Sequence, residues 1–382
     1  MKTFCSYYNQ DICRSCDLIS LDYSDQILLK EKALETALAD LDYPKFLSPI
    51  HSVPTAFRNK AKMVVTGTLN EPIIGLWGES DLDRGRELHN CPLHVTQINE
   101  MLPALKDFIR TAKLVPYHIG SKTGELKGII LFHSEQSHET YLRFVLRSKE
   151  SLDRIRKNQN ILLQEFSHLQ CISVNIQPVA HALLEGEEEI FITDKKSILH
   201  QLGETNFMLG PRAFVQTNQE VATKLYETAA LWVKETKLRK FMELYCGQGA
   251  FSFFASPYIE QGMGVEINEE AIKEANRTAE AFGHTHLKFK SADAALIELE
   301  IKSFEPDIIL VNPPRRGLAQ AIKLLLQYRP EIIIYSSCNH ETLCQDLQKL
   351  AIYYHITKIK IFDMFPNTNH FETLVQLDLK SI

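Results

Sequence analysis

The stretch FMELYCGQGAF, residues 241–251, predicts a buried strand that turns through two glycines into a helix. A Gly-x-Gly turn before a helix N-terminus lets a ligand approach the backbone closely. About twenty residues later, Gly264-Val265-Glu266 ends a second predicted strand with a carboxylate that is placed to accept hydrogen bonds from ribose hydroxyls. The pattern therefore predicts a nucleoside-type cofactor at the edge of a parallel sheet.

Two cofactor classes fit this edge, a dinucleotide and S-adenosyl-L-methionine. The full G-x-G-x-x-G motif is absent because position 252 is Ser252, and a short turn without a pyrophosphate cradle favours S-adenosylmethionine. Asp293 follows the strand-like run 287–290, and its carboxyl would contact the edge of the adenine ring. Helix capping or a surface charge is the alternative role for both Glu266 and Asp293.

Around this stretch, strand-like runs alternate with helical ones from about residue 219 to the C-terminus. We expect a helix over 219–236 and strands near 241–246, 262–267, 287–290, 307–312, 331–337, 355–362 and 371–379. This alternation is typical of a mostly parallel, doubly wound α/β sheet. Before residue 200 the runs are short and irregular, which predicts a mixed, mostly antiparallel module. We therefore expect two domains, a β-rich one over 1–200 and an α/β one over 201–382.

Composition excludes several classes of protein. The 382 residues carry 42 Lys and Arg against 48 Asp and Glu, a net charge of −6, and are 45% hydrophobic. This length buries a core without disulfide staples. No apolar run approaches the roughly 18 residues of a membrane span, and the start, residues 1–5, lacks the apolar region of a signal peptide. We expect a cytoplasmic protein that does not bind membranes.

The negative net charge hides one basic segment. Residues 106–157 hold eleven Lys or Arg against six acids. Upstream, Arg58, Lys60 and Lys62 alternate along a predicted strand, so their charges would sit ~6.6 Å apart on one face, close to the phosphate spacing of a single strand. The sequence leaves two interpretations, an RNA-binding surface and a solvated strand face.

Two further strand ends carry reactive chemistry. Asn312-Pro313-Pro314 follows the strand near 307–312, at the sheet edge where open α/β sheets bind ligands. Cys338 follows the strand near 331–337 and precedes a helix expected to begin at Asn339 or His340, a position that predicts a lowered pKa and a nucleophilic thiolate. Packing is the alternative role, which we assign to Cys171 and Cys344.

Glu372, at the start of the last strand, is a candidate general base because a partly apolar pocket raises a carboxyl pKa.

Four more cysteines suggest a metal site. Cys5, Cys13 and Cys16 crowd the N-terminus, and Cys91 lies in Asn90-Cys91-Pro92. In a reducing compartment such cysteines bind metals more often than they form disulfides. Four thiolates suit either a 4Fe-4S cluster or zinc. The spacing x7 then x2 differs from the x3 then x2 of radical S-adenosylmethionine enzymes.

Taken together, these motifs resemble one family, the RNA (uracil-5-)-methyltransferases, from Cys5 to the C-terminal strand. The stretches that carry the resemblance are Cys5-x7-Cys13-x2-Cys16, 57–65, 214–218, 244–249, 312–317, 336–339 and 363–372. The resemblance implies a Rossmann-like class I methyltransferase domain at the C-terminus. It also favours the 4Fe-4S cluster over zinc. Relatives that act on transfer RNA resemble this chain in its C-terminal half but lack the cluster cysteines.

The resemblance implies a mechanism and a substrate. Cys338 would add to carbon 6 of uracil, carbon 5 would take the methyl group, and Glu372 would remove the carbon 5 proton. The substrate would be a loop uridine of 23S ribosomal RNA, position 747, flipped out of its stack by a monomeric enzyme. The implied S-adenosylmethionine contacts are Gln216, Tyr245, Glu266 and Asn312, with Asp293 as a fifth.

Three other functions remain open at this point. A transfer RNA uracil methyltransferase would share the C-terminal motifs but not the four cysteines. An amino-group methyltransferase with Asn-Pro-Pro would need no thiol, which would leave Cys338 idle. A non-catalytic ribosome-assembly factor that binds RNA would be expected to have lost Cys338 or Glu372, and both are present.

Overall fold

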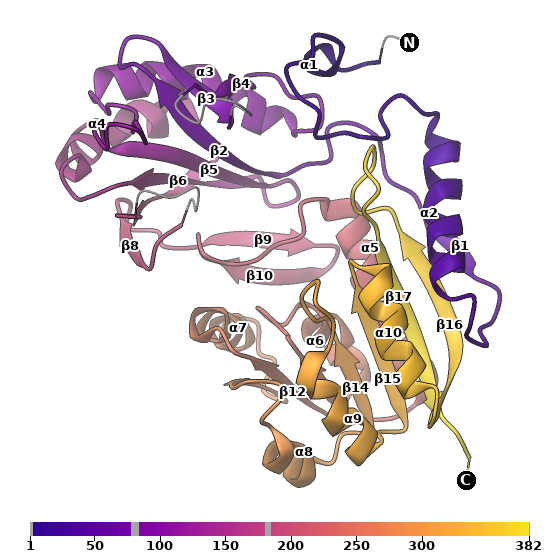
Figure 1. Cartoon of the computed structure of the whole chain (residues 1–382). Coiled ribbons are helices and arrows are strands. Elements are labelled where there is room, and N and C mark those ends of the chain that lie inside the picture. The colour runs from indigo at the N-terminus through magenta and orange to yellow at the C-terminus, as the bar shows by residue number, and fades with distance from the viewer. Residues whose placement is uncertain (1–2, 78–83, 180–184, 382) are drawn as a thin grey trace. The chain divides into compact units, whose positions relative to one another are not determined.

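The computed structural model describes residues 3–77, 84–179 and 185–381 (Figure 1). Met1 and Lys2, part of the N-terminal stretch considered above, lie outside these ranges. The chain forms two compact units. Unit 1 comprises Met1–Cys16, Pro54–Gln201 and Met208–Pro211, and unit 2 comprises Asp17–Val53, Leu202–Phe207 and Arg212–Ile382.

Unit 2 is built on an eight-stranded sheet with the order β1-β16-β17-β15-β14-β11-β12-β13. Neighbours from β15 through β14 and β11 to β13 are parallel, and β17 runs antiparallel to both β15 and β16. The strands are β1 (Leu47–Ile50), β11 (Lys240–Leu244), β12 (Gln261–Glu266), β13 (Leu287–Ser291), β14 (Ile308–Val311), β15 (Ile332–Ser337), β16 (Tyr354–Phe362) and β17 (Glu372–Leu379). The mostly parallel sheet predicted from the alternation of strands and helices is confirmed.

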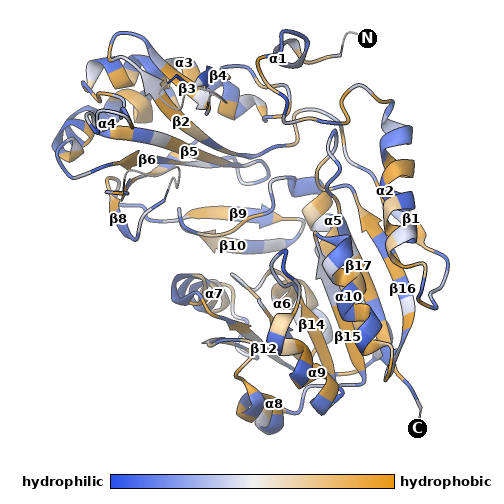
Figure 2. Cartoon of the chain, viewed as in Figure 1, coloured by the Kyte–Doolittle hydropathy of each residue, from blue (hydrophilic) through white to orange (hydrophobic). Residues whose placement is uncertain are grey.

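Helices cover both faces of this sheet, because successive strand residues point to opposite sides. Phe241 and Leu310 join the core under one helical layer, whereas Met242 and Ile309 join the core under the other. The first layer holds α5 (Gln219–Thr236), α6 (Ala250–Ala255), η1 (Ser256–Tyr258) and α7 (Glu269–Ala281). The second holds α2 (Tyr23–Ala37), α8 (Glu298–Phe304), η2 (Ala319–Ala321), α9 (Ile322–Tyr328) and α10 (His340–Leu350). Figure 2 shows the central strands as largely hydrophobic and α10 as amphipathic.

Unit 1 contains a seven-stranded sheet with the order β4-β3-β2-β5-β6-β7-β8. Its pairs are antiparallel except β6 with β7, which agrees with the expected mixed module. The elements are α1 (Ser6–Asn9), β2 (Lys60–Gly67), β3 (Pro72–Leu76), β4 (Arg86–Glu87), α3 (Thr96–Thr111), β5 (Leu126–Ser134), β6 (Glu139–Leu146), α4 (Leu152–Glu165), β7 (Leu169–Ile176) and β8 (Glu188–Phe191). A hairpin of β9 (Ile198–Leu202) and β10 (Thr205–Leu209) follows in the chain.

One segment groups differently from the sequence-based expectation. Residues 17–53 belong to unit 2, whereas the sequence pattern assigns them to a first module over 1–200. The reason is packing over a long sequence distance, since Leu34 and Leu38 join the core around α10 and β1 pairs with β16. In the part of the chain that the structure describes, no helix is both long and apolar enough to cross a membrane.

Candidate active site

The predicted site residues of unit 2 gather at the carboxyl ends of its parallel strands. Tyr245, Glu266, Asn312 and Cys338 follow or end β11, β12, β14 and β15, which are neighbours in the sheet. Ligands of open α/β sheets bind at this edge, where the strand order reverses. The sheet therefore brings together residues that lie up to 93 positions apart in the sequence.

The glycine turn after β11 leaves room for a ligand. Gly247 and Gly249 have φ angles of 55° and 85°, a left-handed region that favours glycine. A Cβ on Gly247 would meet no atom within 4 Å, whereas one on Gly249 would lie 2.4 Å from the Phe289 ring. Gly249 is thus needed for close packing, and the space beside Gly247 fits a cofactor at the turn.

Glu266 and Asp293 both bind backbone amides. Glu266 accepts hydrogen bonds from Gly247 N at 3.2 Å and from Asn268 N at 3.0 Å, so its carboxylate holds the glycine turn against the end of β12. Asp293 is exposed and accepts a hydrogen bond from Ala295 N at 2.9 Å. The turn-capping role considered for these acids is therefore present for Asp293, while Glu266 also borders the glycine turn.

Tyr245 adopts an unusual backbone conformation at the end of β11. Its φ angle is 59°, which costs a non-glycine residue about 1–2 kcal/mol. The hydroxyl donates to Leu318 O at 3.2 Å, and the ring is half-buried against the core. Burial, with Asp293 nearby, raises the pKa of Tyr245 to about 12, so the ring stays neutral beside the proposed cofactor position.

Cys338 and Glu372 lie next to each other because of the strand register. Ser337 at the end of β15 pairs with Thr373 of antiparallel β17, so the next residue, Cys338, lies opposite Glu372. Arg315, from the loop after β14, donates a hydrogen bond to the Cys338 sulfur and acts electrostatically on Glu372. Arg315 lies in the motif 312–317, but no role was assigned to this residue from the sequence. Its position just after the carboxyl end of β14 is the signal that could have indicated one.

The Glu372 side chain is buried, and burial raises its pKa to about 8. A hydrogen bond from Gln216 and the charge of Arg315 oppose this rise. Gln216, which the family resemblance assigns to the cofactor, thus contacts the candidate base in this structure. The prediction of a raised pKa for Glu372 is confirmed, and the group is poised to exchange a proton near neutral pH.

The predicted pKa of Cys338 is wrong in direction. The helix α10 does begin at His340 with Asn339 as its N-cap, as expected. However, burial and the neighbouring Glu372 raise the pKa of the Cys338 thiol, and the hydrogen bond and charge of Arg315 only partly compensate. In the free protein, Arg315 therefore favours the Cys338 thiolate, whereas burial and the charge of Glu372 oppose it.

The four predicted metal ligands all lie in unit 1. Burial raises the pKa of Cys16 to about 12, and Cys91, Cys13 and Cys5 each add to that rise through their charges. The thiols are thus within electrostatic reach of one another. Among the residues that the structure describes, however, no group of three or more Cys, His, Asp or Glu is arranged to hold a metal ion.

Most of the basic segment is engaged within the protein. Lys127 is buried and donates to Gln177 O and Val179 O. Ion pairs join Lys106 to Glu87, Arg110 to Asp107, Arg143 to Glu189, Arg147 to Glu125, Lys149 to Glu188, Arg154 to Glu150 and Arg156 to Asp153. Exposed pairs can open toward a phosphate, whereas Arg143 is fully buried. The segment is therefore a weaker RNA surface than its charge count suggests.

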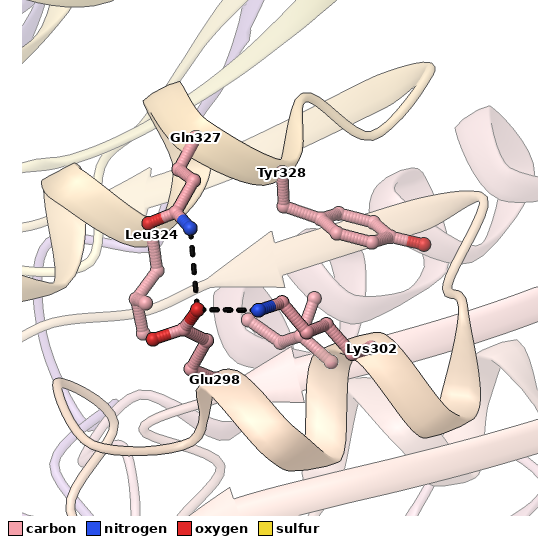
Figure 3. Close-up of a pocket in the computed structure, with 6 residues that line it drawn as sticks. Glu298, Lys302, Leu324, Gln327 and Tyr328 are labelled. Carbon is pink, nitrogen blue, oxygen red and sulfur yellow. Dashed lines mark hydrogen bonds and ion pairs between the residues drawn. The ribbon is translucent and has the colours of Figure 1, made fainter.

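A small pocket between α8 and α9 contains none of the predicted site residues (Figure 3). Glu298 bonds to Lys302 at 2.6 Å and accepts from Gln327 Nε2 at 3.2 Å across it. The bond from Gln327 connects α9 to α8, whereas the bond to Lys302 lies within α8, so the pocket belongs to the helical layer.

The sheet and its ligand-binding edge define an S-adenosylmethionine-dependent methyltransferase fold. The chain belongs to the tRNA (Uracil-5-)-methyltransferase family, whose model matches residues 22–380. The predicted family is thus confirmed, and the protein is a methyltransferase.

Known proteins similar to this chain fall in the same family. A Haemophilus influenzae (strain PittGG) protein named 23S rRNA (uracil(747)-C(5))-methyltransferase RlmC is 40% identical over 389 residues, covering 99% of each chain. A Vibrio vulnificus (strain CMCP6) protein of the same name is 41% identical over 374 residues, 98% of this chain and 99% of that one. The crystal structure of Pyrococcus abyssi tRNA (uracil-54, C5)-methyltransferase with S-adenosyl-L-homocysteine has the same fold. It matches with a TM-score of 0.81 and 24% identity over 96% of this chain and 86% of that chain.

Proposed function

We propose that the protein transfers a methyl group from S-adenosylmethionine to carbon 5 of a uridine in 23S ribosomal RNA, at the position numbered 747 in the relatives' name. The observation that carries the proposal is that Cys338 and Glu372 lie opposite each other at the ends of two antiparallel strands, with Arg315 hydrogen-bonded to the Cys338 sulfur. Identity of about 40% over the full chain to relatives named for this reaction supports the substrate.

The first step is addition of Cys338 to the uracil ring. The thiolate forms a bond to carbon 6, and the electron pair of the carbon 5–carbon 6 double bond moves onto the ring as an enolate. Arg315 favours the thiolate before addition. The enolate then makes carbon 5 nucleophilic enough to take the methyl group from the sulfonium of S-adenosylmethionine.

The second step is elimination, which needs a base. Glu372 removes the carbon 5 proton, the double bond re-forms, and the Cys338 sulfur leaves carbon 6 with its electron pair. A pKa of about 8 suits a carboxylate that must accept and later release a proton near neutral pH. Gln216, hydrogen-bonded to Glu372, holds this base toward the ring.

The cofactor would be held at the turn after β11. Glu266 fixes the turn through Gly247 N and is half-exposed, so it could accept from a ribose hydroxyl. Asn312 and the Tyr245 ring would border the same cofactor. Asp293 keeps its proposed place at the adenine edge, and Gln216 would serve the cofactor and the base together.

The direct test is methyl transfer with tritiated S-adenosylmethionine. Purified protein is incubated with unmodified 23S transcript or with total transfer RNA, and the nucleosides are separated. We expect label in 5-methyluridine from 23S RNA only, and no label with Cys338→Ala. Label from transfer RNA would move the substrate to that of the Pyrococcus abyssi enzyme. No transfer to either RNA, with the cofactor bound, would favour the assembly factor.

We also propose a 4Fe-4S cluster at Cys5, Cys13, Cys16 and Cys91, with zinc as the alternative metal. The donor set supports it, because four free cysteines interact electrostatically with one another and four thiolates are the ligand set of such a cluster. The cluster residues would hold and orient the N-terminus in unit 1 without entering the methyl-transfer steps. Iron, sulfide and zinc analysis of anaerobically purified protein tests this.

Two variants sharpen the metal test. Cys13→Ser removes one proposed ligand, whereas Cys171→Ser changes a buried cysteine on β7 and serves as the matched control. We expect iron and sulfide in the parent and in Cys171→Ser, and their loss in Cys13→Ser. Metal retained by Cys13→Ser would show that Cys13 is not a ligand, and zinc without sulfide would show that the site holds zinc in place of the cluster.

An enzyme that acts on ribosomal RNA would work in the cytoplasm. We expect it to be a monomer, and light scattering tests the oligomeric state.

A further inference from the structure

A buried ion pair ties α2 to the loop that precedes the candidate base. Lys30 Nζ lies 2.5 Å from Asp363 Oδ1, and the two side chains are 1% and 0% exposed. Lys30 also donates to Phe365 O at 3.1 Å. Asp363 begins the connection 363–371 between β16 and β17, and this connection ends at Glu372.

Other side chains of the same segment hold the loop at further points. Tyr23 donates its hydroxyl proton to Asp363 Oδ2 at 2.6 Å. Gln26, itself buried, accepts from Asn367 N at 2.8 Å, and Asn367 has a φ angle of 66°. Leu18 N donates to Asn367 O at 3.0 Å. The loop is thus fixed along its length, including one residue in a strained conformation.

The loop reaches the surroundings of Cys338 and leads directly into Glu372. His370 Nε2 lies 3.4 Å from Arg315 Nη2, and Arg315 in turn bonds to the Cys338 sulfur. Glu372 follows two residues after His370, at the start of β17, and is buried. A shift of the loop would therefore change the surroundings of Arg315 and of the base together.

A buried ion pair is a poor source of stability, because desolvating both charges offsets most of their attraction. An apolar pair of similar size would pack as well without that cost. The charged pair instead adds geometric specificity, because the Lys30 ammonium must contact both the Asp363 carboxylate and Phe365 O. The pair therefore suits a role in setting the position of the loop.

We propose that Lys30 is a positioning residue that, through Asp363, aligns loop 363–371 and so keeps Glu372 buried beside Cys338. This rests on the proposed role of Glu372 as base. Segment 17–53, the part of unit 2 that precedes the methyltransferase motifs in the chain, would then help to position the catalytic base.

The readout is the pH dependence of methyl transfer. Groups that face Glu372 are Arg315 and Cys338 at the neighbouring strand ends, Gln216 before α5 and Tyr226 on α5. None of them is changed in the variants below. If the loop loosens, water reaches Glu372, its pKa falls toward the ordinary value, and the acidic limb of the kcat/KM profile moves to lower pH.

Three variants separate alignment from stability. Tyr23→Phe removes one hydrogen bond to Asp363, Lys30→Met removes the cation, and the double variant Lys30→Met/Asp363→Leu removes both charges. Lys32→Met, exposed on the same helix, is the matched control. Each is assayed for thermal unfolding, S-adenosylmethionine binding, kcat, KM and the pH profile.

We expect Tyr23→Phe and the double variant to stay folded, to bind S-adenosylmethionine within twofold of the parent, and to lose at least tenfold in kcat. Their acidic limb should move down by about one pH unit, with Lys32→Met unchanged. A double variant that regains parental kcat and pH profile would overturn the proposal, as would a kcat loss that merely follows the folded fraction. Failure of the parent itself to methylate RNA would instead refute the proposed function.

Discussion

The burial of Glu372 predicts that this one carboxyl makes the protein less stable as pH rises. Its pKa is about 8 in the folded protein against an ordinary value of 4.5. The folded state therefore holds a proton that the unfolded state releases, and stability falls as pH rises from 4.5 through 8. At 1.36 kcal/mol for each pH unit, the difference of about 3.5 corresponds to about 5 kcal/mol at pH 9 and to about 3 kcal/mol at pH 7.

The perturbation is Glu372→Gln, which keeps the shape of the side chain and cannot ionise. We expect the variant and the parent to have similar stability at pH 4.5 and to diverge above it, with the variant up to about 5 kcal/mol more stable at pH 9. The same variant should add to the ring and take the methyl group but fail to release 5-methyluridine. It should accumulate a covalent, methylated RNA adduct, because the carbon 5 proton stays in place.

The assay must follow unit 2 alone, since a chain of two units need not unfold in one step. The sequence has two tryptophans, Trp77 and Trp232, and Trp232 is buried on α5. In a Trp77→Phe background, urea unfolding followed by fluorescence therefore reports on unit 2. Exposed Glu280→Gln serves as control. Parallel stability curves for parent and Glu372→Gln from pH 4.5 to 9 would refute the reasoning.

The remaining predictions concern the thiol and the glycine turn. Cys338→Ala should lower methyl transfer by at least about 10³-fold while cofactor affinity, from calorimetry, stays within twofold. Arg315→Met should slow adduct formation about tenfold at pH 7 and less at pH 9, because the cation lowers the pKa of Cys338, which stopped-flow or gel assays would follow. Gly249→Ala should destabilise unit 2 by about 1–3 kcal/mol in urea, because its φ is 85° and its Cβ would clash. Gly247→Ala should lower the stability of unit 2 by about 1 kcal/mol. It should weaken cofactor binding about tenfold or more, because the added methyl group occupies the open space beside the glycine turn.

Local pattern was enough to predict the strands of unit 2 from β11 to β17, but not β1. The central strands are short continuous apolar runs between helical stretches, so β11 and β15 begin and end within two residues of the expected ranges. The helix over 219–236 matches α5, and its start is fixed by Asn218, whose side chain accepts from Val221 N. These features depend on neighbours in the sequence, which is why the sequence alone reveals them.

Features that depend on distant residues could not be predicted. The partner of Lys30 is Asp363, 333 positions away, and no local pattern connects α2 to that loop. The thiol of Cys338 illustrates the same limit. Its helix terminus was predicted correctly, but the sign of its pKa change depends on burial and on Glu372 across the sheet. The basic segment was overrated for the same reason, since its acidic partners lie on other elements, as Glu189 does for Arg143.

The raised pKa values of Cys338 and Glu372 are compatible with the proposed mechanism, because the two anions need not exist together. At pH 7 Glu372 holds its proton, which leaves Arg315 free to favour the Cys338 thiolate. Addition to carbon 6 then moves the negative charge into the ring, and methyl transfer consumes it. Only after that must Glu372 release its own proton to solvent, so that its carboxylate can take the carbon 5 proton, and by then the neighbouring sulfur is a neutral thioether. One cation beside the two acids is therefore sufficient, provided that Cys338 and Glu372 are ionised one after the other.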